Sequence, residues 1–135
     1  MHHHILIPVA LDHESVVPKK IEAARALLTE GGRMSLITVL ENVPGYVAEF
    51  VAVEQENHLT QKVRDKLTRL ADGDESISID VLSGKPGLMV TDYARKNGVD
   101  LIIVGSHKPN VQDYFLGSTA ARIARRAPCS VFVIR

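Results

Sequence analysis

The sequence predicts an α/β fold: a five-stranded parallel sheet with helices on both faces. Short apolar runs alternate with segments whose apolar residues recur at helical spacing, in the order β-α-β-α-β-α-β-α-β. The 135 residues suit one domain of ordinary size, and 45% of them are hydrophobic, as in globular proteins. We therefore assign residues 5–135 to a single domain.

The first predicted strand is the apolar run 5–10. A helix follows it, because apolar residues recur at spacings of four, three and four at Val17, Ile21, Ala24 and Leu28. Pro18 suits the first turn of this helix, Ser15 could cap it, and Gly31-Gly32 is expected to end it. The second strand is predicted over residues 34–40.

The middle of the chain begins with a predicted loop over residues 41–50, in which Tyr46 is a candidate helix start. A helix is predicted from Leu59 to Ala71, where apolar residues recur through a charged stretch. Alternation over residues 77–81 indicates a half-exposed strand at a sheet edge. The next helix is expected to open at Gly84-Lys-Pro-Gly87 and to stop at Asn97-Gly98.

The last elements are a strand over 101–104, a helix over 117–127 and a strand over 130–134. In a doubly wound sheet, ligands bind beyond the carboxyl ends of the strands, where the strand order reverses. For the order 3-2-1-4-5 this point lies between the first and fourth strands. The loops 11–14 and 106–116 are therefore expected to border a ligand crevice.

The last strand has no helix after it, so an apolar edge is expected to be exposed. Pairing with the same strand of a second copy would satisfy that edge. We therefore expect a homodimer through Val131, Phe132, Val133 and Ile134.

Composition excludes several classes of protein. Lys+Arg and Asp+Glu both number 16, and this zero balance argues against nucleic acid as a partner, which needs a basic excess. No apolar run approaches the length of a membrane span, and no signal peptide is visible. The only cysteine, Cys129, allows no internal disulfide, so the cytoplasm is the expected compartment.

The histidines do not form a metal pattern. His13, His58 and His107 lack the spacing of metal ligands and have no pair of cysteines to assist them. Residues 1–4, which include His2 to His4, are interpreted as an added tag or a frayed start. We predict no metal site.

The loop after the fourth strand carries the chemistry that points to phosphate. Gly105 allows close backbone approach, and Gly117-Ser118-Thr119 lies at a helix start, where free N–H groups favour an anion. Lys108 could add a positive charge and His107 a hydrogen bond. The same glycines also suit a plain connection in which Gly105 ends a strand and Ser118 caps a helix. The spacing is not that of a P-loop.

The stretch VDLIIVGSHKPNVQDYFLGSTAARIARRAPCSVFVIR, together with the opening ILIPVALDHES, resembles the universal stress protein family over essentially the whole chain. The Ser-His-Lys-Pro and Leu-Gly-Ser parts of the loop resemble the small bacterial F and G types. This resemblance implies the order 3-2-1-4-5, dimers through the last strand and binding of ATP by a Gly-x2-Gly-x9-Gly-Ser/Thr motif. Gly105 matches the first glycine and Gly117-Ser118 the last pair, whereas the middle glycine is absent and the loop is one residue shorter.

The resemblance implies an ATP site, or a site for a related adenine nucleotide with or without Mg²⁺. The family's Asp after the first strand is replaced by Ala10, and Asp12 either substitutes for it or caps the next helix. Arg122, Arg125 and Arg126 suggest a solvated face from which one side chain could reach a phosphate or a dimer partner. The implied binding residues are Pro8, Val9, Ala10, Asp12, Val39, Gly105, Ser106, His107, Lys108, Gly117, Ser118 and Thr119.

Three function classes remain open on the sequence. The first is a regulatory or protective stress protein that binds an adenine nucleotide, with no catalytic residue assigned. The second is a weak ATPase or self-phosphorylating protein, with Ser118 or Thr119 as acceptor, although metal-binding carboxylates in a recognisable pattern are lacking. The third is a dimeric interaction module that binds no nucleotide.

Overall fold

The computed structural model describes residues 1–10, 16–41, 53–106 and 116–135. Within them, parallel strands form one five-stranded sheet in the order β3-β2-β1-β4-β5, so the predicted fold class and strand order are confirmed. The strands are β1 (His2–Pro8), β2 (Leu28–Leu40), β3 (Ile77–Ser83), β4 (Leu101–Gly105) and β5 (Ser130–Ile134). The helices are α1 (Val17–Leu27), α3 (Val53–Leu70), α4 (Pro86–Lys96) and α5 (Ser118–Arg126).

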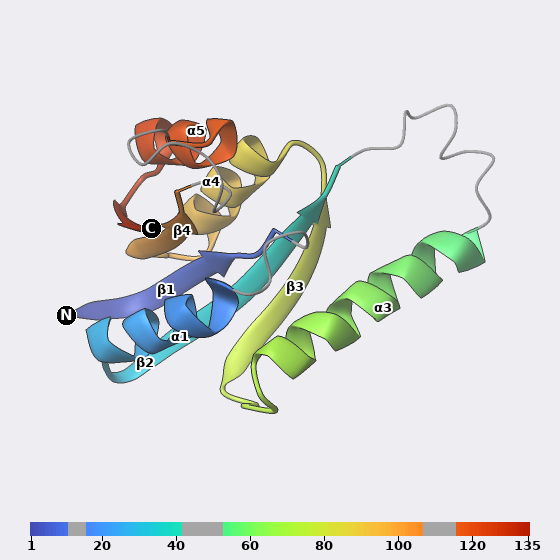
Figure 1. Ribbon diagram of the computed structural model, residues 1–135, viewed down its shortest axis with the longest axis horizontal. Coiled ribbons are helices and arrows are strands. Elements are labelled where there is room, and N and C mark those ends of the chain that lie inside the picture. The colour runs from blue at the N-terminus through green and yellow to red at the C-terminus, as the bar shows by residue number, and fades with distance from the viewer. Residues whose placement is uncertain (11–15, 42–52, 107–115) are drawn as a thin grey trace.

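The helices cover the sheet from both sides, with α1 and α3 on one face and α4 and α5 on the other (Figure 1). Strand β1 shows why. Ile5 and Ile7 belong to the core on the α1 side, whereas Leu6 belongs to the core on the α4 side, and all three side chains are fully buried. Because side chains alternate across a strand, an uninterrupted apolar run needs cover on both faces.

Helix α1 ends earlier than the glycines predicted. It begins as expected, with Pro18 in its first turn, but the backbone becomes extended at Leu28, and β2 starts there. Gly31-Gly32 therefore lies inside β2, where Gly31 has a φ of +78°. The pairing register is irregular at this point, since His2 faces Leu28 while His4 faces Arg33. The glycines accommodate this irregularity rather than ending the helix.

The remaining elements follow the prediction closely. Helix α3 starts at Val53 rather than at Leu59, whereas the candidate start at Tyr46 lies outside the described residues. Strand β3 is at the sheet edge, as its alternation indicated. Of the helices in the described ranges, none is long and apolar enough to cross a membrane.

The expectation of a frayed start is wrong, because His2, His3 and His4 belong to β1. The Asp100 carboxylate accepts hydrogen bonds from the backbone N–H groups of His3 and His4, at 2.8 and 3.1 Å. The buried His4 ring donates from Nδ1 to the Asn97 carbonyl at 3.0 Å, and the Ser35 hydroxyl lies 2.8 Å from Nε2. Long-range contacts thus order a segment that composition alone made look like a tail.

Asp100 holds this start in place. Burial alone would raise the pKa of its carboxyl, but the amide hydrogen bonds from His3 and His4, together with electrostatic attraction from His2 and His3, outweigh burial, and the pKa lies below its ordinary value. The ionised carboxylate is thus the form that the folded protein stabilises.

We predict that Asp100→Ala lowers the free energy of unfolding by about 1 to 3 kcal/mol, because two backbone amides lose a charged acceptor. Urea denaturation measures the change. Asp92→Ala is the matched control, since Asp92 makes only an exposed pair with Lys96 on the surface of α4 and should cost less than about 0.5 kcal/mol. Equal losses in the two variants would contradict the anchoring role of Asp100.

Candidate functional site

The carboxyl ends of β1, β2 and β4 meet at one edge of the sheet. Pro8 pairs with Ile37, and the Val9 N–H continues this pairing by donating to the Ile37 carbonyl at 2.7 Å. Extended by two residues, the same register sets Ala10 level with Val39. On its other edge β1 pairs with β4, and Leu6 lies opposite Ile102. If this register is continued by three residues, Val9 is level with Gly105. The predicted wall and the first glycine of the loop therefore lie close together at the topological switch point.

Ser106 connects three elements at this edge. Its N–H donates to the Ile134 carbonyl at 3.0 Å, and its carbonyl accepts from the Gly117 N–H at 2.7 Å. A β-carbon at residue 117 would lie 3.2 Å from that carbonyl oxygen, so glycine allows this close approach. The start of α5 is thereby fastened to the end of β4. The Ser106 side chain is buried, and its hydroxyl has no partner among the described residues.

The N-terminus of α5 offers free hydrogen-bond donors beside this junction. Gly117 is the N-cap and supplies no side-chain cap, and the first helical bond is donated by Ala121 to the Gly117 carbonyl at 2.8 Å. The N–H groups of Ser118, Thr119 and Ala120 thus precede the first helical bond. The Ser118 and Thr119 side chains are exposed. Free amides, hydroxyls and the helix dipole together favour an anion here.

Lys20 of α1 reaches the same edge from the other face of the sheet. Only 5% of this residue is exposed. Its Nζ lies 3.4 Å from the Pro8 carbonyl oxygen, and a β-carbon at Gly105 would lie 3.6 Å from Nζ. Burial lowers the pKa of the ammonium below its ordinary value of 10.5. A lysine head therefore lies beside the ends of β1 and β4.

Sequence reasoning missed Lys20, although a signal was present. Residue 20 lies three positions after Val17 and directly before Ile21, so it falls on the apolar stripe of the helix. Of the described lysines, it is the one that is buried. A lysine on an apolar stripe commonly extends its ammonium group to solvent, and the burial of Lys20 excludes this for the present chain.

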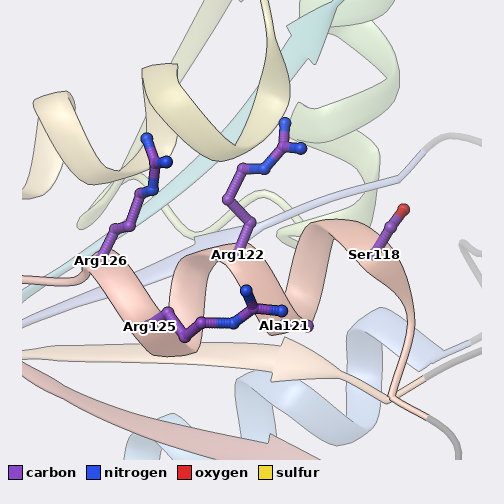
Figure 2. A pocket seen from close by; sticks show the side chains of 5 residues that line it. All are labelled: Ser118, Ala121, Arg122, Arg125 and Arg126. Atoms are coloured by element: carbon purple, nitrogen blue, oxygen red, sulfur yellow. The ribbon is translucent and has the colours of Figure 1, made fainter.

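A second cationic feature runs along α5. A hollow of about 230 Å³ is lined by Ser118, Ala121, Arg122, Arg125 and Arg126 (Figure 2). Figure 2 shows the guanidinium groups of Arg122 and Arg126 directed toward a neighbouring helix, and Arg122 packs against Gly87 of α4, where a β-carbon would lie 2.7 Å from its Cδ. In the described part of the chain, no carboxylate pairs with these arginines.

The structure places most of the predicted site residues. Those at the carboxyl edge are Pro8, Val9, Ala10, Val39, Gly105, Ser106, Gly117, Ser118 and Thr119. Asp12, His107 and Lys108 lie outside the described residues. The residues that the structure does describe contain no group of histidine, cysteine and carboxylate side chains that could hold a metal ion.

The profile of the universal stress protein family matches residues 1–135. The chain belongs to this family. Universal stress protein A homolog 2 of Coxiella burnetii is 30% identical over 137 residues, which cover 97% of this chain and 93% of the relative. Universal stress protein G of Escherichia coli O157:H7 is 25% identical over 142 residues, with both chains covered completely.

Solved structures share the fold. Hypothetical protein MJ0577 superimposes with a TM-score of 0.81 at 24% identity, over 99% of this chain and 96% of its own. A universal stress protein in complex with cAMP gives 0.64 at 19% identity, over 99% and 97%. The universal stress protein from Archaeoglobus fulgidus in complex with dAMP gives 0.63 at 16% identity, over 97% and 96%.

We predict that Lys20→Met raises the free energy of unfolding of the ligand-free protein by about 1 to 3 kcal/mol at neutral pH, because it replaces a desolvated cation with an apolar chain of similar length. The lowered pKa means that the unfolded chain binds more protons than the folded one. The stability of the wild type should therefore rise relative to Lys20→Met as the pH increases from that lowered pKa toward 10.5. Urea denaturation at several pH values measures this difference, and a constant difference would contradict it.

Proposed function

We propose that this universal stress protein binds ATP or a related adenine nucleotide at the carboxyl edge of β1 and β4. Nucleotide occupancy would control a regulatory or protective role in the stress response. The observation that supports this most strongly is the junction at Ser106. It holds the donor-rich start of α5 against the end of β4 at the switch point, where α/β proteins bind their ligands.

Two solved proteins of the same fold support an adenine nucleotide as the ligand, since one is in complex with cAMP and the other with dAMP. Both share under 20% identity with this chain, so the choice of nucleotide rests on the site itself. The donors at the start of α5 number several amides and two hydroxyls, which suits an extended phosphate chain.

We assign the parts of the nucleotide to the edge as follows. The backbone of Val39, at the end of β2, would meet the adenine, with Pro8, Val9 and Ala10 as the adjoining wall. The phosphates would lie against Gly105, Ser106 and the start of α5. Asp12, His107 and Lys108 complete the assignment as sequence-based predictions, with Mg²⁺ as an optional companion of the phosphates.

Isothermal titration of the purified protein with ATP tests the proposal. We predict that the double variant Ser118→Ala, Thr119→Ala binds ATP about tenfold more weakly or worse, because two hydroxyl donors are lost from the phosphate site. The control is Thr68→Ala, since the Thr68 hydroxyl is exposed on α3 and donates only to the Arg64 carbonyl within that helix. This control should bind ATP like the wild type.

The absence of any heat with the wild type at high micromolar ATP would contradict nucleotide binding. The chain would then be an interaction module that acts without a nucleotide. Equal binding by the double variant and the wild type would instead remove the start of α5 from the phosphate site while leaving nucleotide binding intact.

We further propose that the protein forms a homodimer through β5. This strand lies at the edge of the sheet, and Phe132 and Val133 are 42% and 38% exposed, which is unusual for large apolar residues. A second copy of β5 would pair the free backbone edge from Val131 to Ile134 and cover the side chains of Phe132 and Val133. We also propose that the protein acts in the cytoplasm, since its single cysteine cannot form an internal disulfide and suits a reducing compartment.

Light scattering after size exclusion tests this assembly. We predict that the wild type has twice the chain mass of 14.8 kDa and that Val133→Lys shifts it to the monomer, because a charge at the strand edge opposes pairing. Leu88→Lys is the matched control, since Leu88 is an exposed apolar residue of α4, 53% accessible, away from β5. It should remain a dimer. A monomeric wild type at micromolar concentration would overturn the proposal.

A further inference from the structure

Lys20 is a buried cation whose hydrogen bonding is incomplete. An ammonium group carries three N–H donors. Within the described residues, the one acceptor that it contacts is the Pro8 carbonyl, at the long distance of 3.4 Å. No carboxylate of those residues pairs with it. A buried ammonium without an anionic partner is costly, and a leucine or methionine would fill this position of the apolar stripe at no such cost.

The position of Lys20 relates it directly to the proposed phosphate site. Its Nζ lies next to the Cα of Gly105, on the α1 side of β4. The next residue, Ser106, contacts the start of α5 through the Gly117 N–H. A ligand at the end of β4 therefore has the cation of α1 on one side and the free amides of α5 on the other. Both groups are held by helices, so neither needs to be ordered when the ligand binds.

Gly105 takes on a second role in this arrangement. A side chain there would project toward the Lys20 head, since a β-carbon would lie 3.5 Å from Cε and 3.6 Å from Nζ. A β-carbon would therefore be in ordinary van der Waals contact with the ammonium, and glycine leaves this side of it without a covering side chain. The first glycine of the loop thus allows access to the ammonium as well as to the backbone.

We propose that the Lys20 ammonium binds a phosphate group of the nucleotide and makes the site selective for phosphorylated forms over adenosine. This inference rests on the function proposed above. Charge supports it, because the donors that the described start of α5 presents are neutral amides and hydroxyls, and Lys20 adds a positive charge that favours a polyphosphate. When a phosphate binds, its contact with the ammonium offsets the cost of desolvation that the buried cation carries in the ligand-free protein.

Titration calorimetry with ATP and with adenosine provides the test, applied to the wild type, Lys20→Met and Lys19→Met. Lys20→Met should bind ATP at least about tenfold more weakly, since a charge-assisted hydrogen bond is lost, and should bind adenosine like the wild type. Lys19→Met is the matched control. Lys19 is the exposed neighbour on the same helix and contacts only the Arg135 carbonyl, at 3.3 Å. Unchanged ATP binding by Lys20→Met would overturn the inference.

A second readout reports on Lys20 itself. In protein labelled with ¹⁵N at the lysine side chains, the signal absent from the Lys20→Met spectrum identifies its ammonium. Saturating ATP should raise the pKa of this group, because a nearby negative charge favours the protonated form. A purely structural lysine would keep its pKa, and that result would also overturn the inference.

Inorganic tripolyphosphate separates the failure of this inference from failure of the proposed function. If ATP and adenosine both fail to bind the wild type, nucleotide binding is wrong. The anion site at Lys20 still stands if tripolyphosphate raises the thermal midpoint of the wild type and of Lys19→Met but not that of Lys20→Met. If tripolyphosphate shifts all three proteins equally, or none of them, Lys20 binds no phosphate.

Discussion

The fold depends on the burial of β1 at the centre of the sheet. Its side chains enter the cores on both faces, so its backbone polar groups must pair with β2 and β4. The pairing with β2 ends just beyond Pro8, at the hydrogen bond from the Val9 N–H to the Ile37 carbonyl. The Val9 carbonyl beyond it accepts from the Thr38 hydroxyl at 2.7 Å instead. The chain thus leaves the sheet at a defined level, beside the ends of its neighbours.

The reversal of strand order around β1 is what brings functional groups together. Parallel strands end on the same side of the sheet, so segments from distant parts of the chain meet at one edge. These segments are residues 8–10, 20, 105–106 and 117–119. Residues 8–10 contribute the wall of the proposed site and Lys20 contributes a cation. Residues 105–106 contribute a backbone that a ligand can approach closely, and residues 117–119 contribute free amides. The Ser106 junction keeps the last two in fixed relation.

Lys20 and His4 show two outcomes of burying a polar group. The His4 ring is bonded at both nitrogens, so its burial is compensated within the folded chain, and it stabilises the start of β1. The Lys20 ammonium has one long bond to a carbonyl, and its burial is not compensated in the same way. A polar group of the second kind, placed where a ligand is expected to bind, indicates function rather than stability.

Local patterns in the chain were enough to establish the order of strands and helices, the edge position of β3 and the small residues Gly105 and Gly117 on either side of the loop after β4. Alternation and helical spacing depend on which face of an element is buried, and each element records this in its own residues. The ordered His2–His4 segment, the place of Gly31-Gly32 within β2 and the burial of Lys20 were decided only by tertiary structure. Asp100 anchors the His2–His4 segment, and pairing with β1 determines the place of Gly31-Gly32. The end of β4 lies over the Lys20 head. Each of these partners is remote in sequence, and its effect leaves no local periodic signal.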